Sequence, residues 1–569
     1  MLSACTGDEN ISTEPADQAR MFPQGVASGD PKPSSVVLWT RVEAAGAAAV
    51  TVDFEVASDD SFNTIVVSGQ SDATADSDHT IRLLVTGLNP YTHYYYRFTA
   101  TDAQGLTVQG VIGRTKTAPS EEQDVAVRFA YASCQDFNGR YYHAWEALAA
   151  EPDIDFVLFL GDYVYETEGN PTFQDPTAER HITVPDGLTL GSGKNTFNAA
   201  VTLADYRSLY KQYRSDKHLQ RVHQMFPFVL IWDDHEFAND CWQDHSTDFD
   251  EAKGDEKSPD RRRAATQAWF EYQPADVDYN PDAGFPNDIR VYRSLRFGKH
   301  VHIVLTDQRY YRDDHLIPEG PADPDVAKLF ENSSLGSRSF VLKSGFDLKE
   351  AAAKPTMLGA QQKQWLIDEI NGSNATWKVW GSETQLSQMA ADLSSFKNLP
   401  ASYQDLFYIT TDQWDGYRSE RADILNAIGG SDNVIVLVGD IHAFYASELY
   451  PDFDAPAATP AAIEYVVAGI SSSPMQESVQ RAVDGNKTLS SLGLGGLVEK
   501  FDEILTDTSA HYKYAASDAT GVAIATVSAT AFEVEFLLID DIKTPTWNGN
   551  VTRKKFRTAA GVKAIELVS

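Results

Sequence analysis

The sequence has few cysteines and few basic residues for its length. Its 569 residues include 3 cysteines, and 47 Lys and Arg stand against 82 Asp and Glu, which gives a formal net charge of −35. Three cysteines cannot build a disulfide framework. The shortage of Lys and Arg argues against a nucleic-acid-binding protein, because phosphate backbones are bound by basic surfaces. An anionic membrane surface is disfavoured for the same reason.

Long hydrophobic runs are also missing. No stretch of about 18 apolar residues occurs, so we expect no transmembrane helix. Residues Met1 to Cys5 look like the end of a bacterial lipoprotein signal, and this match is either a truncated remnant or chance. On the first interpretation, residues 1–20 are a signal remnant and flexible tether. The protein is then bacterial and exported to the periplasm or cell surface, with a lipid anchor at Cys5.

The N-terminal region, residues 21–119, has the pattern of a small all-β domain. Short β-branched or aromatic runs alternate with turn-forming residues, and the clearest runs are 36–39, 50–56, 65–67, 81–85 and 94–99. About seven such strands in 100 residues predict an immunoglobulin-like or fibronectin-like β-sandwich. A polar linker is expected at residues 115–122.

From Val125 the pattern changes to apolar strands that alternate with helices. The predicted strands are residues 127–132, 156–160, 228–232, 302–305, 377–380 and 434–438. Continuous apolar runs indicate strands buried on both faces, and therefore a layered α/β domain over residues 125–569. Residues 521–539 are strand-like again and are expected to add antiparallel strands to the sheet.

Metal-binding side chains follow four of these strands. The four segments are Ser133-Cys134-Gln135, Gly161-Asp162-Tyr163-Val164-Tyr165-Glu166, Asp233-Asp234-His235-Glu236 and Gly439-Asp440-Ile441-His442. In open α/β sheets the carboxyl ends of the strands meet at one crevice, so these side chains are expected to lie together. One bridging carboxylate could then serve two cations, which act together on the attacking and leaving oxygens of a displacement.

The ligand types predict two different metal positions. A thiolate and a phenolate beside carboxylates favour a trivalent ion at the first position. The second position would have only carboxylate oxygens, from Asp162, Asp234 and Asp440, which suit Ca²⁺, Mg²⁺ or Mn²⁺. A disulfide between Cys134 and Cys241 is the alternative use of the thiol. A metal-bound thiolate excludes it, and we expect Cys241 to be free and buried.

The ordered motifs, together with Gly25–Pro31 and Val37–Arg41, resemble those of PhoD-type alkaline phosphatases, a branch of the calcineurin-like metallophosphatases. The resemblance implies an α/β fold, with an αββα four-layer catalytic sandwich behind the N-terminal β-sandwich. It also implies a centre of one ferric ion with one or two calcium ions, other divalent metals being the alternative. The wider superfamily has Gly-Asn-His-Asp/Glu and Gly-His-x-His, where this chain has Asp-Asp-His-Glu and Gly-Asp-Ile-His. Carboxylates thus replace an Asn and a His, and this exchange favours calcium.

The resemblance also assigns the metal ligands. The residues implied for iron are Cys134, Asp162, Tyr165 and His442. The residues implied for calcium are Asp162 as the bridge, Asp234 and Asp440, with Asn239 as a further ligand or a support for one.

Three residues are expected at the substrate. His235 is the expected proton donor or phosphate-binding group, and Arg207 and Arg309 are expected to bind phosphate through their guanidinium groups. For each arginine, a structural ion pair or stacking contact is the alternative.

The predicted function is metal-dependent hydrolysis of small phosphate esters, monoesters and diesters, with release of inorganic phosphate. The alternatives are a phospholipase D-like enzyme acting on phospholipid headgroups, which needs an apolar rim at the crevice, and a non-enzymatic adhesion or ligand-binding protein. One trivalent and two divalent ions bring about +7 against about −5 from their ligands, so the centre would be locally positive; with one divalent ion it would be about neutral. The net charge therefore describes the exterior, and salt should help or leave unchanged the capture of an anionic ester.

Overall fold

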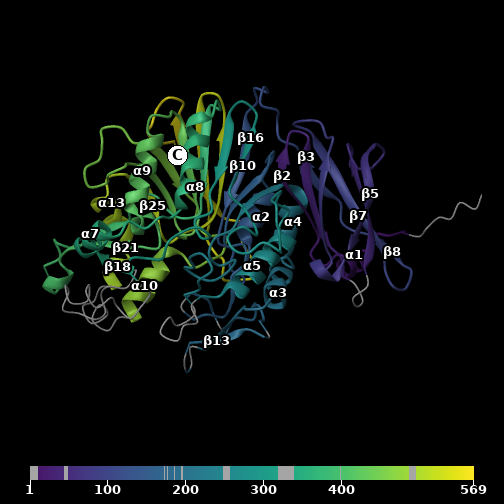
Figure 1. The fold of residues 1–569 in the computed structure, drawn as a ribbon, viewed down its shortest axis with the longest axis horizontal. Coiled ribbons are helices and arrows are strands. Elements are labelled where there is room, and N and C mark those ends of the chain that lie inside the picture. Colours follow the sequence, from purple (N-terminus) through teal and green to yellow (C-terminus); the bar gives the residue numbers. More distant parts are fainter. Residues whose placement is uncertain are drawn as a thin grey trace, which may run out of the picture.

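The computed structural model describes residues 11–43, 49–247, 257–317, 339–485 and 495–568, apart from positions 172, 176, 185, 192, 194, 195 and 398. These residues form a mixed α/β fold (Figure 1). The N-terminal strands, in purple, lie at one end of the molecule, and the green and yellow C-terminal half lies at the other. The strands that were expected to end at the site belong to two large sheets.

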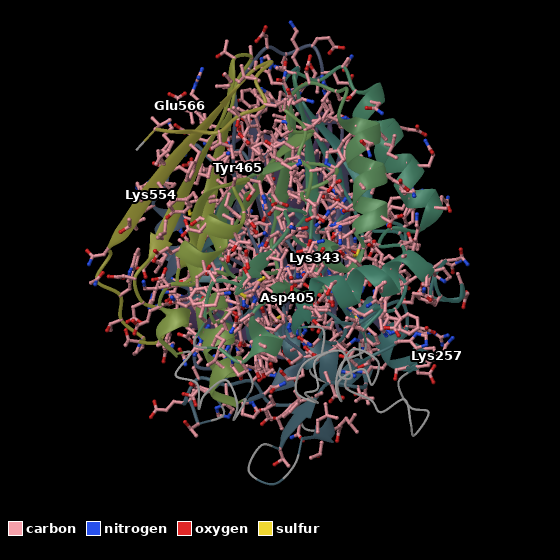
Figure 2. The ribbon with its side chains drawn as sticks, turned by 90° about the vertical axis from the view of Figure 1, so that its left-hand side faces the viewer. Lys257, Lys343, Asp405, Tyr465, Lys554 and Glu566 are labelled. Atoms are coloured by element: carbon pink, nitrogen blue, oxygen red, sulfur yellow. The ribbon has the colours of Figure 1, made fainter. Side chains whose placement is uncertain are left out.

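The larger sheet contains four parallel neighbours, β10, β11, β15 and β2. Its order is β29 (Glu566–Leu567), β28 (Val551–Ala559), β27 (Ala531–Ile539), β26 (Thr520–Val527), β10 (Val127–Ala132), β11 (Val157–Leu160), β15 (Phe228–Ile231), β2 (Val26–Lys32), β3 (Ser35–Arg41), β6 (Thr80–Thr86). Strand β26 runs antiparallel to β10, and β27 antiparallel to β26, so the added C-terminal strands are confirmed. Figure 2 shows Lys554 and Glu566 at the outer edge formed by β28 and β29. Charged side chains protect such an edge from pairing with other chains.

The second sheet has a parallel centre made of β17, β19, β22 and β24. Its order is β16 (Arg293–Phe297), β17 (Val301–Leu305), β19 (Trp377–Ser382), β22 (Val434–Val438), β24 (Ala462–Val466), β23 (Phe444–Leu449), β25 (Tyr512–Ala516).

The two large sheets pack face to face, and the alternation of side chains along each strand shows it. In β11, Leu158 and Leu160 belong to the same buried cluster as Ile435 of β22, while Phe159 points to the opposite face. In β22, Val436 likewise faces away from that cluster. Successive side chains of a strand point to opposite faces, so each of these strands is buried on both sides, as its continuous apolar sequence predicts.

Helices cover the outer face of each sheet. The buried cluster on the outer side of the larger sheet takes residues from α2 (His143–Ala149), α3 (Leu203–Tyr213), α4 (Lys217–Met225) and α5 (Pro259–Tyr272). The cluster on the outer side of the second sheet takes residues from α7 (Lys343–Ala352), α8 (Gly359–Gly372), α9 (Arg418–Ile428), α10 (Met475–Gly485), α12 (Gly495–Val498) and α13 (Phe501–Thr508). Within the described part of the chain, no helix is long and apolar enough to cross a membrane.

The N-terminal strands form a sheet of their own and also extend the larger sheet. The separate sheet contains β1 (Ile11–Ser12), β4 (Val50–Ala57), β5 (Ile65–Ala73), β7 (His93–Thr101), β8 (Thr107–Gln109) and β9 (Gly113–Lys116). Strands β2, β3 and β6 pack on it around one hydrophobic core and join the larger sheet where Gly29 pairs with Phe228. Residues 11–20, expected to be a tether, instead supply β1 and most of α1 (Pro15–Met21). Cys5 lies outside the described residues.

Two small sheets lie in long connections. One contains β12 (Thr167–Glu168), β14 (Phe197–Ala199) and β13 (Leu188–Leu190) and follows the Gly161 to Glu166 segment; the other contains β18 (Ser339–Leu342), β21 (Leu406–Thr410) and β20 (Ala390–Asp392). The second small sheet borders the site described next.

Candidate metal centre

The polar residues that follow β10, β11, β15 and β22 meet at the carboxyl ends of the two sheets. Cys134 lies next to the β11 turn, because its backbone N–H donates to the carbonyl of Gly161 at 3.1 Å. Gly439, after β22, is packed against Ser133 so closely that an added Cβ would lie 2.7 Å from the Cβ of Ser133. The two sheets therefore bring their strand ends to one place, as the crevice rule for open sheets predicts.

The backbone turns sharply at the residues that carry the candidate metal ligands. Cys134, Asp162, Asp440 and His442 all have left-handed φ angles, of 58°, 58°, 60° and 56°. Non-glycine residues seldom adopt this conformation, and it is typical of functional sites, where the surrounding structure holds the strain. The turn before Asp162 requires Gly161, whose φ is 99° and whose added Cβ would lie 2.4 Å from the Cβ of Asp233.

The first group of ligand atoms contains sulfur, nitrogen and oxygen. Ligand atoms of Cys134, Asp162 and His442 all lie within 4.8 Å of one another. The Tyr165 hydroxyl donates to Asp162 Oδ2 at 3.0 Å and lies 3.2 Å from His442 Nε2. His442 Nδ1 lies 2.8 Å from the carbonyl of Ser473, to which it donates, so Nε2 is the nitrogen left to accept or to bind a cation.

The second group contains only carboxylates. Oxygen atoms of Asp162, Asp233, Asp234 and Asp440 all lie within 4.8 Å of one another, and a third combination joins Asp162 and Asp234 to His235. Asp162 belongs to all three combinations. It therefore has the position that a carboxylate shared by two cations would need.

The chemistry of these donors fits bound cations. Burial and the neighbouring carboxylates raise the pKa of Asp162 well above its usual range, and burial raises the pKa of Asp440 to about 7. The buried Oδ2 of Asp233 has no hydrogen-bond partner. Crowded, buried carboxylates with a free oxygen are stabilised by positive charge, and a cation among them would supply it.

Arg309 supplies part of that positive charge from beneath the cluster. Its guanidinium donates to Asp233, to Asp412 Oδ2 at 2.9 Å and to Asp440 Oδ1 at 3.0 Å. The Arg309 side chain has no exposed surface. The expectation that Arg309 binds phosphate is therefore corrected, because its N–H groups are used to hold the carboxylates of the cluster.

Arg207 does not reach the cluster. Its Nε and Nη2 donate to the two carboxylate oxygens of Glu271 at 2.7 and 2.6 Å, and Nη2 also donates to the carbonyl of Asp76. This bidentate ion pair connects α3 to α5 and uses the guanidinium face that phosphate would need. The expectation that Arg207 binds phosphate is corrected, and the structural alternative holds.

His235 and Asn239 both line the cleft above the cluster. His235 Nδ1 donates to Glu166 Oε2 at 2.6 Å, so the Nε2 atom is the one that remains for a ligand. Glu166 Oε1 accepts from the backbone N–H of Asn239 at 2.8 Å. Burial opposes protonation of His235, but the carboxylates of Glu166, Asp162 and Asp234 outweigh it and raise the pKa of the imidazole well above its usual value.

Four residues of the site were missed in the sequence, namely Asp233, Glu166, Asp412 and Glu236. The buried carboxylate of Glu236 accepts from the backbone N–H groups of Asp162, Tyr163 and Asp233, and so holds two of the turns together. Asp233, Glu166 and Glu236 stand inside the motifs that were recognised, whereas nothing in the local sequence marks Asp412.

Cys134 and Cys241 are both free and buried, which agrees with the expectation that they do not form a disulfide.

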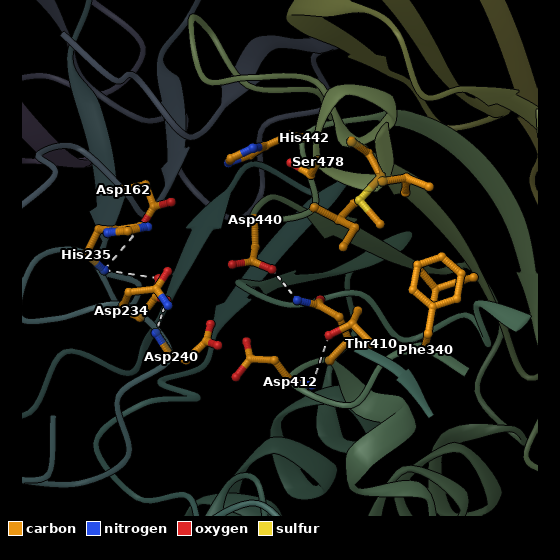
Figure 3. Close-up of a pocket in the computed structure, with 16 residues that line it drawn as sticks. Asp162, Asp234, His235, Asp240, Phe340, Thr410, Asp412, Asp440, His442 and Ser478 are labelled. Carbon is orange, nitrogen blue, oxygen red and sulfur yellow. Dashed lines mark hydrogen bonds between the residues drawn. The ribbon is translucent and has the colours of Figure 1, made fainter. Parts of the chain in front are cut away.

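The cluster opens into a cleft of about 260 Å³. Figure 3 shows Asp162, Asp234 and His235 on one side of it, Asp440 in the middle, and Phe340 on the other side. The arrangement defines a class of protein: an α/β chain with a buried, acidic cluster of possible metal ligands beside a cleft.

The comparisons with known proteins name the family. The PhoD-like phosphatase family matches residues 129–536, and the N-terminal domain of PhoD-like phosphatases matches residues 8–119. The chain belongs to the PhoD-like phosphatase family.

Two relatives agree with this. The chain is 32% identical to alkaline phosphatase D of Bacillus subtilis (strain 168) over 485 residues, which cover 83% of this chain and 73% of the relative. A solved structure described as the structure of PhoD matches with a TM-score of 0.72 at 26% identity, over 97% of this chain and 92% of that one. The family expected from the motifs is confirmed, and with it a phosphatase that hydrolyses phosphate esters with the help of metals. The phospholipase D-like alternative is not favoured.

Proposed function

We propose that this chain hydrolyses phosphate monoesters, and diesters as well, at a centre of one ferric ion and one or two calcium ions. The observation that carries the proposal is the position of Asp162, whose carboxylate lies within 4.8 Å of a sulfur- and nitrogen-containing group on one side and of an all-carboxylate group on the other. Two different cations can share such a residue. Other divalent metals in place of calcium are the alternative that metal analysis decides.

Iron would be held by Cys134, Asp162, Tyr165 and His442. A thiolate and a phenolate require a strong Lewis acid, because burial raises the pKa of the Cys134 thiol and of the Tyr165 hydroxyl well above their usual values. The bond from His442 Nδ1 to the Ser473 carbonyl fixes the ring with Nε2 toward the group.

Calcium would be held by Asp162, Asp234 and Asp440, to which the structure adds Asp233 as a candidate. Hard divalent ions prefer oxygen ligands of this kind. Asn239 lines the cleft beside these carboxylates and is kept as a candidate ligand.

Different residues of the chain then have different roles in hydrolysis. When bound, the cations supply Lewis acidity for the in-line attack of water on phosphorus. His235 Nε2 gives a proton to the leaving oxygen as the ester P–O bond breaks, so that the products are phosphate and an alcohol. Glu166 keeps the other ring nitrogen protonated and orients the ring. Arg309 keeps the carboxylates in position from below.

The domain arrangement and location complete the proposal. We propose an immunoglobulin- or fibronectin-like β-sandwich at residues 21–119, supported by its separate hydrophobic core. Residues 125–569 would form an αββα four-layer catalytic sandwich, supported by the helix clusters outside each of the two packed sheets. Export to the periplasm or cell surface, with a lipid anchor at Cys5, is supported by the N-terminal motif alone.

Hydrolysis of a chromogenic monoester and a chromogenic diester tests the proposed activity. We expect both to be hydrolysed by the purified protein, activity to be lost on chelation, and activity to return when iron and calcium are added together. If neither ester is hydrolysed with metals present, the proposed function is wrong.

A further inference from the structure

The cleft has two chemically different walls. One wall carries the carboxylates and His235, and the other carries apolar side chains, namely Phe340, Ile409, Ile441, Met475 and Val479. We propose that the cleft selects phosphate esters whose organic group is small and apolar, an alkyl or aryl group that packs on this second wall. The inference rests on the proposed function, because it concerns which esters the same centre accepts.

The apolar wall is built from three elements that converge on the cleft. Helix α10 contributes Met475 and Val479, which are four residues apart and therefore on one face of the helix. Strand β21 contributes Ile409, and its antiparallel neighbour β18 contributes Phe340. In Figure 3, Phe340 lies across the cleft from Asp162 and Asp234, and Ser478 lies beside His442.

The wall is connected directly to the metal-binding residues. Ile441 stands between Asp440 and His442 in the chain and lines the cleft with them. The backbone N–H of Met475, the first residue of α10, donates to the carbonyl of His442 at 3.0 Å. A phosphoryl group held at the carboxylates therefore has the apolar wall within the same small cleft, where its ester substituent would have to lie.

Charge and size restrict the substituent further. None of the described residues that line the cleft is Lys or Arg, and its polar wall includes Asp240 and Asp412. Asp412 is itself paired with Arg309 and Arg312, whose side chains are buried behind the cleft. The described lining therefore offers no Lys or Arg side chain to a second anionic group on the substrate. The volume of about 260 Å³ lies below the range of about 300–1,000 Å³ typical of pockets for drug-sized ligands, so the substituent is small.

A series of n-alkyl phosphates measures the contribution of the wall. Methyl, ethyl, propyl and butyl phosphate have leaving groups of similar reactivity, so kcat/KM changes mainly with contact to the protein. Burial of one methylene corresponds to roughly a three- to fourfold gain in kcat/KM. We expect kcat/KM to rise with each carbon until the cleft is full, and glycerol phosphate to fall roughly tenfold or more below propyl phosphate.

A double variant of α10, Met475→Gln with Val479→Thr, places polar atoms on the wall and keeps similar side-chain sizes. In this variant kcat/KM should rise less with the length of the alkyl chain, while methyl phosphate is still hydrolysed. The matched control is Val483→Thr, one turn further along α10, where the side chain is equally buried but does not line the cleft. In the control, kcat/KM should rise with alkyl chain length as it does in the wild type.

The outcomes separate the inference from the function on which it rests. An active wild-type enzyme with a flat alkyl series, or with equal use of glycerol phosphate and propyl phosphate, overturns the inference and leaves the proposed function intact. An unchanged series in a folded double variant overturns the assignment of the wall. If the double variant does not fold, the wild-type series decides alone. Absence of hydrolysis of every ester overturns the proposed function and the inference together.

Discussion

Arg309 Nη2 and Asp440 Oδ1 are joined by a hydrogen bond of 3.0 Å, although the strands before them, β17 and β22, are separated in the sheet by β19. The same guanidinium reaches Asp233, which follows β15 of the other large sheet. A single buried cation thus connects carboxylates from both sheets beneath the proposed calcium position. We therefore propose that Arg309 positions the carboxylates that would bind the metals.

Arg309→Lys should weaken calcium binding more than substrate binding. Lysine keeps the charge but cannot donate along the several directions that the guanidinium uses. Loss of a group that orients metal ligands typically costs about 10- to 100-fold in metal affinity. Calcium titration of the activity measures this, with KM for the ester at saturating calcium as the second readout.

Arg207→Lys is the matched control, because Arg207 is bound to Glu271 away from the cluster. Its calcium affinity and kcat/KM should stay within about twofold of the wild type, since only a structural pair is altered. If Arg207→Lys raised KM steeply and Arg309→Lys had no effect on calcium, the roles given to the two arginines would be reversed.

His235→Asn should lower kcat in a way that depends on the leaving group. Removal of a general acid costs about 10²–10⁴-fold. An alkyl ester, whose alcohol leaves only when protonated, should lose much more activity than a nitrophenyl ester. Glu166→Gln should lower the activity on the two kinds of ester in the same order but by less. It removes the negative charge that favours the protonated imidazole, while the amide oxygen can still accept the Nδ1 hydrogen bond. Equal losses for both kinds of ester would contradict proton donation by His235.

His511 should make the fold sensitive to acid at a place far from the chemistry. Burial lowers the pKa of this imidazole to about 4, although the carbonyl of Gln388 accepts a hydrogen bond from it at 2.9 Å. The unfolded chain, with a histidine pKa of about 6.5, takes up the proton first, so stability falls as the pH falls from about 6.5 toward 4. At pH 5 the loss from this group is about 2 kcal/mol.

Urea unfolding at pH 7 and pH 5, for the wild type and His511→Gln, isolates this contribution. The variant cannot titrate, so its loss between the two pH values should be smaller than that of the wild type by about 2 kcal/mol. An equal loss in both proteins would show that His511 is not held neutral by burial.

The strand ends of the site could be predicted from the sequence, and the partners of its charged side chains could not. Continuous apolar runs identify β11 and β22, and the polar residues after them follow from the crevice rule. Which side chains turn inward depends on left-handed turns such as those at Asp162 and Asp440. The motif Asp-Asp-His-Glu does not show that Asp233 joins the cluster beside Asp234. Arg207 was misjudged because Glu271, its partner, lies 64 residues further along the chain.

The fold, too, could be predicted only in part from the sequence. Local alternation predicts the N-terminal strands, but nothing in it indicates that β2 joins the larger sheet. That junction depends on the pairing of Gly29 with Phe228, which lie far apart in the sequence. An added Cβ at Gly29 would lie 2.1 Å from the carbonyl oxygen of Pro274, so the close approach requires glycine. Contacts of this kind become visible only in the folded chain.

The metal content of natively purified protein, measured beside that of Asp162→Ala, tests the central claim most directly. Asp155→Asn serves as the control, because Asp155 is a buried aspartate at the opposite end of β11 and binds Lys116. We expect one iron and one or two calcium ions per chain in the wild type and in the control, and loss of both metals in Asp162→Ala. A wild type without iron and calcium, or an Asp162→Ala variant that retains both, would contradict a centre in which Asp162 is shared by two cations.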